Sequence, residues 1–204
     1  KSIVDGNDRS YLNEIIFDND FKGKSILDIG CSQGYFCIEA LKRGASRALG
    51  IEPLPDNVAS AKAIATEFDL APEYVKTDFE SWDTNEKFDT ILCLNVLHHM
   101  YDPIYVINKM ISMCNERIII EFSPPRWRDV WNKRIGVMSF LAQKEPLLIM
   151  GKPRHPKDSV RVAEYTYMIT PEALRTFFNT YYSSFGKLTI IKSPFKGRMI
   201  AIAE

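Results

Sequence analysis

Residues 26–36, Ile-Leu-Asp-Ile-Gly-Cys-Ser-Gln-Gly-Tyr-Phe, join a short aliphatic run to a turn with two glycines and to the start of a helical pattern. The run at 25–29 is mostly aliphatic, as a strand buried on both faces should be. Gly30 and Gly34 can adopt positive φ and place no Cβ beside a ligand, and a helix at 35–42 would direct its N-terminal amides toward that ligand. The stretch predicts a small molecule bound by backbone at a strand-to-helix turn. The alternative is a tight turn that holds no ligand.

An acidic residue after the next predicted strand supports the presence of a ligand. Residues 47–51 are predicted to form a strand, and Glu52 follows Gly30 by 22 residues. A carboxylate about 20 residues beyond such a turn can accept hydrogen bonds from both hydroxyls of a ribose. We therefore predict that Glu52 binds a ribose; the alternative is a solvated acidic residue in a loop.

Three motifs resemble those of the class I S-adenosylmethionine-dependent methyltransferases. They are Asp-x-Gly-x-x-x-Gly at 28–34, Gly-Ile-Glu at 50–52 and Thr-Asp-Phe at 77–79. The resemblance covers most of residues 24–122 and resumes at the C-terminal hairpin. It implies an α/β fold with a seven-stranded Rossmann-like sheet, mostly parallel with a C-terminal antiparallel hairpin. It also implies S-adenosyl-L-methionine as the cofactor and methyl donor.

The same resemblance implies roles for individual residues. Asp78 would hydrogen-bond the exocyclic amine of the adenine, with Phe79 against the ring; the alternative for Asp78 is a helix cap over Ser81 and Trp82. The family commonly has glycine where this chain has Ser32, whose hydroxyl could meet the carboxylate of the ligand. The predicted cofactor-binding residues are Asp28, Gly30, Cys31, Ser32, Gly34, Glu52, Asp78, Phe79 and Asn95.

Strands and helices are predicted to alternate along the chain, which is typical of a parallel sheet covered by helices. We expect residues 1–204 to form a single domain that ends in an antiparallel hairpin. The predicted strands are 25–29, 47–51, 73–77, 88–94, 117–122, 187–192 and 198–203. The predicted helices are 34–43, 55–69, 103–113 and 171–182.

The composition is that of an ordinary globular protein, with 46% hydrophobic and 25% charged residues among 204. The apolar stretches fall far short of the ~20 residues that a spanning helix needs, so we expect no transmembrane segment. The four cysteines show no Cys-x-x-Cys spacing, which argues against a zinc site and a disulfide framework. Reduced thiols and a cytoplasmic location are therefore expected.

Asn95, His98 and His99 follow the fourth predicted strand, where they would border the methyl group of the donor. An imidazole titrates near neutral pH and can take a proton from a hydroxyl acceptor. Adjacent residues usually point apart, so we favour His99 as the catalytic residue and keep His98 as the second candidate. The alternative is a histidine that packs at the strand end. Some O-methyltransferases that resemble this chain place Glu-x-x-Glu-His here as metal ligands; this chain lacks both carboxylates, so we expect no metal.

Residues 123–168 separate the fifth strand from the next helix and are too long for an ordinary connection. They are rich in aromatic and aliphatic residues, so we expect them to fold as a lid over the acceptor. Nine basic and four acidic residues give this insertion a formal charge of +5, in a chain whose net charge is zero. This charge favours an anionic acceptor, with Arg154 and Lys157 as candidate ligands.

Apolar residues at helical spacing predict an amphipathic helix near 127–141 that packs against the rest of the domain. The alternative is a helix that meets a membrane interface or a partner surface. Tyr165 and Tyr167 are predicted to point at the acceptor, and aromatic packing explains them equally well.

These features predict a methyltransferase that acts on an oxygen or nitrogen nucleophile of a small acceptor, anionic or sugar-type. One alternative is an RNA methyltransferase, since residues 88–103 resemble tRNA wobble-uridine carboxymethyltransferases and the basic insertion would then be an RNA surface. The net charge of zero and the lack of a recognisable RNA-binding module count against it. The other alternative is a non-catalytic domain that keeps the cofactor for regulation. The sequence indicates no oligomeric state.

Overall fold

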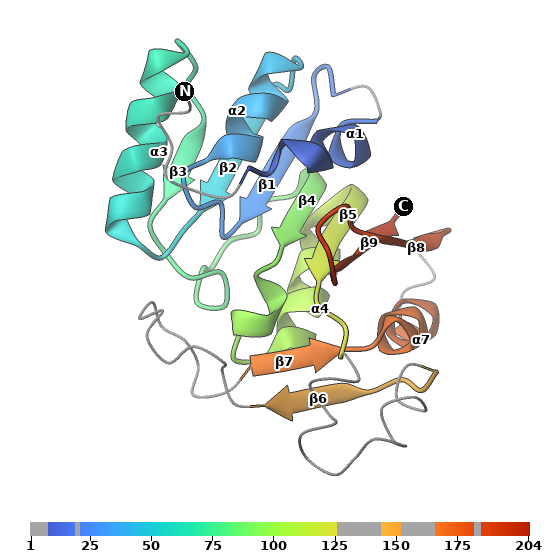
Figure 1. Cartoon of the computed structure of the whole chain (residues 1–204). Coiled ribbons are helices and arrows are strands. Elements are labelled where there is room, and N and C mark those ends of the chain that lie inside the picture. The colour runs from blue at the N-terminus through green and yellow to red at the C-terminus, as the bar shows by residue number, and fades with distance from the viewer. Residues whose placement is uncertain (1–7, 19–20, 126–143, 152–165, 182–184) are drawn as a thin grey trace.

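A seven-stranded sheet forms the centre of the computed structural model, which describes residues 8–18, 21–125, 144–151, 166–181 and 185–204 (Figure 1). The strand order is β3-β2-β1-β4-β5-β9-β8. The first five strands of this order pair in parallel, and β9 runs antiparallel to both β5 and β8. The strands are β1 (Ser25–Ile29), β2 (Arg47–Ile51), β3 (Glu73–Val75), β4 (Phe88–Leu94), β5 (Cys114–Phe122), β8 (Leu188–Lys192) and β9 (Met199–Ala203).

Helices cover both faces of this sheet (Figure 1). Three of them begin with a proline, at a position where the missing N–H would have no helical partner. One face packs against α1 (Asn13–Ile16), α2 (Tyr35–Lys42) and α3 (Pro55–Glu67), and the other against α4 (Pro103–Met113) and α7 (Pro171–Tyr181). None of the helices in the described part of the chain has the length and apolar character that crossing a membrane requires.

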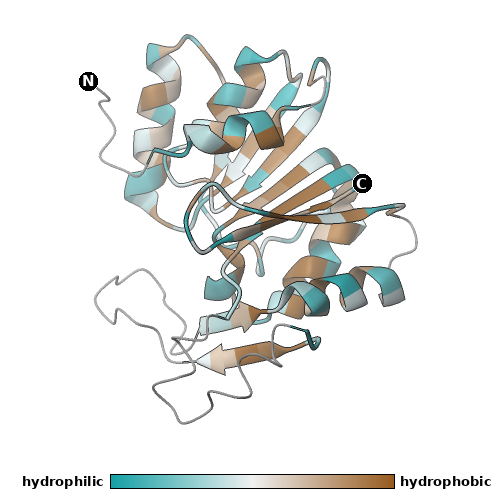
Figure 2. Ribbon diagram, turned by 45° about the vertical axis from the view of Figure 1, so that its right-hand side comes forward, coloured by the Kyte–Doolittle hydropathy of each residue, from teal (hydrophilic) through white to brown (hydrophobic). Residues whose placement is uncertain are grey.

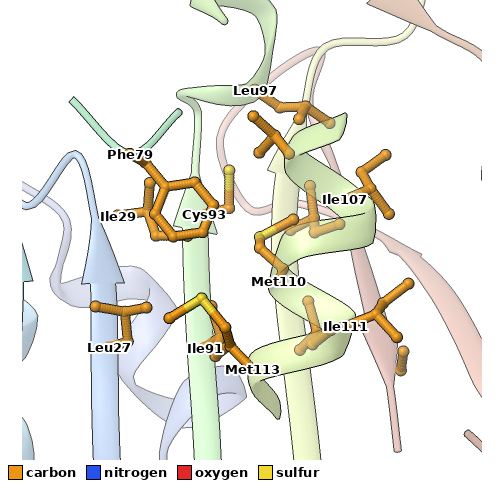
Figure 3. Close-up of a cluster of buried hydrophobic side chains, with 14 of the residues drawn as sticks. Leu27, Ile29, Phe79, Ile91, Cys93, Leu97, Ile107, Met110, Ile111 and Met113 are labelled. Carbon is orange, nitrogen blue, oxygen red and sulfur yellow. The ribbon is translucent and has the colours of Figure 1, made fainter. Parts of the chain in front are cut away.

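The hydrophobic core lies on both sides of the sheet, because successive strand residues point to opposite faces. On β1, Leu27 and Ile29 belong to the cluster that includes Met110 of α4, whereas Ile26 belongs to the cluster on the α2 side. Figure 3 shows the first of these clusters, and Figure 2 shows that the central strands are hydrophobic along most of their length. Burial on both faces explains why these strands appear in the sequence as continuous apolar runs.

The predicted order of strands and helices is confirmed, and β1, β2, β4 and α4 have the predicted bounds. β3 is shorter than predicted because the chain turns after it, with the N–H of Thr77 donating to the oxygen of Val75 over 3.1 Å. β5 starts earlier than predicted, at Cys114, where it pairs with Phe88 of β4.

A second, two-stranded antiparallel sheet was not predicted. It consists of β6 (Leu148–Gly151) and β7 (Thr166–Ile169), which lie near the start of α4 in Figure 1. The hydroxyl of Thr166 donates to the backbone oxygen of His98 over 3.1 Å and so ties β7 to the segment after β4. The helix predicted near 127–141 lies outside the described residues, and the role of 123–168 as a lid stays a prediction.

Candidate functional site

The turn between β1 and α2 uses backbone conformations that L-residues rarely adopt. The φ angle is +69° at Gly30, +50° at Ser32 and +78° at Gly34. The N–H of Gly30 donates to the backbone oxygen of Ile51 over 2.8 Å, and the N–H of Cys31 donates to the same oxygen over 3.0 Å. The predicted strand-turn-helix is therefore confirmed, and its turn is fastened to the end of β2.

Both glycines of the turn are required by packing as well as by backbone conformation. A Cβ on Gly30 would lie 2.6 Å from a methyl carbon of Val96, and one on Gly34 would lie 2.0 Å from the hydroxyl oxygen of Tyr74. The space that we expected to face a ligand is thus filled by protein. The two glycines let the turn after β1 pack against Tyr74 of β3 and Val96 of the segment after β4, so a ligand would meet only the backbone of the turn.

Ser32 occupies a left-handed position that favours glycine, and we expect Ser32→Gly to stabilise the fold by about 0.5–1 kcal/mol. The strain of a non-glycine residue there, roughly 1–2 kcal/mol, exceeds the entropy that glycine adds to the unfolded chain. Urea unfolding of the cofactor-free protein measures the difference. Ser60→Gly within α3 is the control and should destabilise by about 0.5 kcal/mol. A lower urea midpoint for Ser32→Gly would contradict the strain.

Glu52 follows β2 with its carboxylate turned toward the glycine turn, and the residue is only 6% exposed. Its Oε2 accepts a hydrogen bond from the N–H of Ser32 over 3.0 Å. Its Oε1 accepts from the N–H of Leu54 over 3.1 Å and from the amide of Asn57 over 3.2 Å. The burial and the three hydrogen bonds exclude the alternative that Glu52 is a solvated acidic residue in a loop. A carboxylate can accept about four hydrogen bonds, so these three leave one site for a ligand.

Asp28 lies in β1, close to the turn, and is 3% exposed. Its Oδ2 is buried and has no hydrogen-bond partner among the described residues. Burial raises the pKa of this carboxyl to about 7; the positive charge of Arg9 lowers the pKa, and the negative charge of Glu52 raises it. A buried acceptor without a donor is costly, so this oxygen marks a position where a donor from a ligand would be stabilising.

The raised pKa of Asp28 makes the stability of the protein depend on pH. Between its ordinary pKa of 3.8 and about 7, the carboxyl keeps its proton in the folded state and loses it in the unfolded state. Its contribution to stability is therefore complete below pH 3.8 and lost as the pH rises to about 7. Asp28→Asn should remove this decline, changing the slope of the unfolding free energy by up to ~1.4 kcal/mol per pH unit. Equal slopes for the two proteins in urea titrations would contradict the shift.

Asp78 and Phe79 follow β3, and the structure gives them different surroundings. Oδ1 of Asp78 accepts from the N–H of Ser81 over 2.9 Å, which is the capping bond of the alternative interpretation, although residues 79–81 form a turn and no helix. Phe79 is 2% exposed and belongs to the same hydrophobic cluster as Ile29 and Cys93 (Figure 3). Its ring has almost no surface left for a ligand, so the predicted contact with the adenine requires the ring to leave this cluster.

Asn95 follows β4 in a left-handed conformation, with φ +63°. Its N–H donates to the backbone oxygen of Glu121 over 2.8 Å, which fastens the end of β4 to β5. Because β4 lies between β1 and β5 in the sheet, Asn95 stands between the glycine turn and the end of β5.

His98, and not the favoured His99, lines a cavity beside the small sheet. Burial lowers the pKa of His98 to about 3, with smaller effects from His99 and Arg198, and its Nδ1 is buried without a partner among the described residues. His98 is thus neutral near pH 7 and a poor proton acceptor. His99 is exposed, with its ring centre 3.9 Å from that of His98. The cavity is lined by Leu97, His98, Pro103, Phe122, Ser123, Leu148, Tyr167 and Ile169.

Of the four predicted acceptor ligands, only Tyr167 lies within the described residues. It belongs to β7 and lines the same cavity as His98, and its hydroxyl donates to the backbone oxygen of Tyr101 over 3.3 Å. Arg154, Lys157 and Tyr165 lie outside the described residues, so their roles stay predictions. Within the described ranges, no three His, Cys, Asp or Glu side chains are grouped so that they could hold a metal ion.

Glu121 lies near the C-terminal end of β5, at the same edge of the sheet as the glycine turn after β1 and Glu52 after β2. It was not among the predicted site residues. It is 0% exposed. Its Oε2 accepts from Arg9 over 2.8 Å and from Arg198 over 3.1 Å, and its Oε1 accepts from the hydroxyl of Ser193 over 2.7 Å. The available signal was a glutamate inside the aliphatic run 118–122, because a charged residue in a buried strand needs partners.

Comparison of the sequence with protein families finds a match over most of the chain. A family model described as "Methyltransferase domain" matches residues 9–159. The ubiquinone biosynthesis O-methyltransferase of Bradyrhizobium diazoefficiens is 39% identical over 80 residues, which cover 39% of this chain and 31% of that protein. The chain spans about a third of the length of the curated relatives it matches.

Solved structures at lower identity share the fold. Magnesium protoporphyrin IX methyltransferase from Synechocystis PCC 6803, with bound S-adenosylhomocysteine, has a TM-score of 0.65 and 21% identity over 95% of this chain and 80% of that one. The 1,6-didemethyltoxoflavin-N1-methyltransferase of Burkholderia thailandensis, also with bound S-adenosylhomocysteine, has a TM-score of 0.64 and 13% identity over 96% and 76%. These likenesses confirm the predicted mostly parallel sheet with its C-terminal antiparallel hairpin.

Proposed function

Because this chain belongs to the methyltransferase-domain family, we propose that it is an S-adenosylmethionine-dependent methyltransferase that acts on an oxygen or nitrogen nucleophile of a small acceptor. The O-methyltransferase relatives favour oxygen. The acceptor is proposed to be anionic or sugar-type, and the formal charge of +5 in the 123–168 insertion supports the anionic class. The four unpaired cysteines are compatible with a reducing compartment, and we propose the cytoplasm.

The observation that carries this proposal is the position of Glu52 against the glycine turn. A buried carboxylate at the end of the second strand, with room for one further hydrogen bond, suits a hydroxyl of a ribose. The buried Oδ2 of Asp28, which lacks a donor among the described residues, provides a second acceptor at the same edge. A ligand that satisfies both groups must bring several donors, as a nucleoside with an amino-acid tail does.

The contribution of the protein to the reaction is binding and alignment. S-adenosylmethionine supplies, when bound, a methyl group on a sulfonium sulfur that is open to in-line displacement. Glu52 and Asp78 would hold the nucleoside, and alignment of the reacting atoms contributes up to ~7–11 kcal/mol in favourable cases. The neutral His98 can accept a hydrogen bond from an acceptor hydroxyl, but its low pKa makes it a weak general base. Proximity therefore accounts for more of the rate than proton transfer does.

Methyl transfer from labelled S-adenosylmethionine to separated metabolite, glycan and RNA pools tests the proposal. Glu52→Ala serves as the inactive control, because it should lose the donor. Label in a small acidic or sugar-containing product supports the proposed function. Label in RNA would replace it with the RNA alternative, and tight S-adenosylhomocysteine binding without transfer to any pool would favour a non-catalytic domain.

A further inference from the structure

Two arginines share one buried carboxylate at the edge of the sheet where the site lies. Arg9 comes from the segment before α1, Arg198 immediately precedes β9, and both donate to the same Oε2 of Glu121. The other carboxylate oxygen accepts from Ser193. Two positive charges therefore face one negative charge, and the group keeps a formal charge of +1.

This excess charge is only partly accessible to solvent. The side chains of Arg9 and Arg198 are 22% and 16% exposed, and that of Glu121 is 0% exposed. The Nε of Arg9 is buried and has no hydrogen-bond partner among the described residues. A net positive charge and an unmet donor are both costly when withdrawn from water, so an anion at this place would be stabilising. The nearby Asp28, on which the charge of Arg9 acts, adds a negative charge only as the pH rises through its pKa of about 7.

Arg198 is held in place and still has donors to offer. Among the described residues, its guanidinium donates to Glu121 over 3.1 Å and also interacts with the hydroxyl of Tyr11. The guanidinium lies over the ring of Phe195, 4.1 Å from its centre. The turn that carries it is closed by bonds from the N–H of Ser193 to the oxygen of Arg198 over 3.0 Å and from the N–H of Arg198 to the oxygen of Phe195 over 3.1 Å. A planar guanidinium fixed in this way is suited to two-point binding of a carboxylate.

The two arginines act on different parts of the site. The charge of Arg9 acts on Asp28, near the glycine turn, whereas the charge of Arg198 acts on His98, which lines the cavity beside β7. In the sheet, β9 is four strand spacings from β2, or about 19 Å, and Glu52 directly follows β2. Arg198 is therefore remote from the proposed ribose.

We propose that Arg198 anchors a carboxylate group of the methyl acceptor, with Glu121 and Phe195 as the residues that position its guanidinium. This inference rests on the proposed function, because it divides the site between a donor and an acceptor. It makes the acceptor a small carboxylic acid and narrows the anionic class suggested by the charge of the insertion.

The test uses benzoate as the anionic probe and benzamide as the uncharged probe of the same shape, added to protein saturated with S-adenosylhomocysteine. The readout is the side-chain Nε–H resonance of Arg198 in ¹⁵N-labelled protein, assigned by its loss in Arg198→Lys. We expect a saturable shift with benzoate in the millimolar range and none with benzamide. Arg198→Lys keeps the charge but loses the two-point geometry, so benzoate affinity, followed through neighbouring backbone amides, should fall ~5-fold or more. The control variant is Arg175→Lys, which changes an exposed arginine of α7 and should leave benzoate affinity unchanged.

Several outcomes overturn the proposal. An absent benzoate shift, an equal shift with benzamide, or unchanged benzoate affinity in Arg198→Lys would each refute a carboxylate site at Arg198. Displacement of benzoate by S-adenosylhomocysteine, or a tenfold loss of S-adenosylhomocysteine affinity in Arg198→Lys with an unchanged melting temperature, would assign the arginine to the donor. If S-adenosylhomocysteine does not bind at all, the proposed function fails, whatever benzoate does. Because the resonance shift is measured on the unmodified protein, it remains decisive even if the variant is unstable.

Discussion

Glu52→Ala is expected to weaken S-adenosylhomocysteine binding by about 100-fold, as measured by titration calorimetry. The carboxylate is assigned to the ribose, and hydrogen bonds to a charged group contribute about 1.5–3 kcal/mol each. The variant also removes the acceptor that holds the N–H of Ser32, so the turn loses a support at the same time. Both effects act in the same direction on the donor.

The matched control for this prediction is Glu67→Ala, which removes an exposed glutamate at the end of α3. Its S-adenosylhomocysteine affinity should equal that of the unmodified protein. Asn57→Ala removes one of the three donors to Glu52 and leaves the carboxylate, so it should give an intermediate loss. Unchanged affinity in Glu52→Ala would refute the placement of the ribose, whereas equal losses in Glu52→Ala and Glu67→Ala would point to a general loss of stability.

Glu121→Ala is expected to lower the free energy of unfolding by about 3–5 kcal/mol, because it leaves two guanidinium groups partly buried without their anion. The substitution also removes the acceptor of the Ser193 hydroxyl. The N-terminal segment, β5 and the turn before β9 therefore lose the residue that links them. Urea unfolding of the cofactor-free protein measures this decrease in unfolding free energy.

Glu116→Ala is the control on the same strand. Glu116 is half-exposed and pairs with Lys24 at the surface, so its removal should cost about 1 kcal/mol or less. Similar decreases in unfolding free energy for the two variants would show that the buried network of Glu121 contributes no more to stability than a surface ion pair does. A Glu121→Ala protein that keeps its stability but loses benzoate binding would leave the positioning role of Glu121 intact and refute its structural one.

The parts of the fold that could be predicted from the sequence are those set by local patterns. β1, β2 and β4 are continuous apolar runs, and Pro103 marks the first residue of α4. The bounds that differ were decided by neighbouring strands: β5 extends back to Cys114 because Phe88 of β4 offers it a partner. The pair β6 and β7 was missed because 14 residues separate Gly151 from Thr166 and no turn signal links them.

The candidate site divides in the same way. Asp28, Glu52 and the glycine turn belong to motifs with fixed spacing, so they could be named in advance. Glu121 could not be connected to its partners, since Arg9 lies 112 residues before it and Arg198 lies 77 residues after it. The choice between His98 and His99 also needed the structure, because burial beside β7 sets the pKa of His98.

The sequence by itself determined the sheet, the strand-to-helix turn and the methyl donor that the turn implies, because apolar periodicity and glycine conformations act between residues close along the chain. Only the tertiary structure decided that the glycines accommodate Val96 and Tyr74, that Phe79 lies in the core, and that Asp28 has a buried oxygen without a donor. It also brought two arginines to Glu121. Burial and charge pairing arise from contacts between distant segments, and these contacts exist only once the sheet has formed.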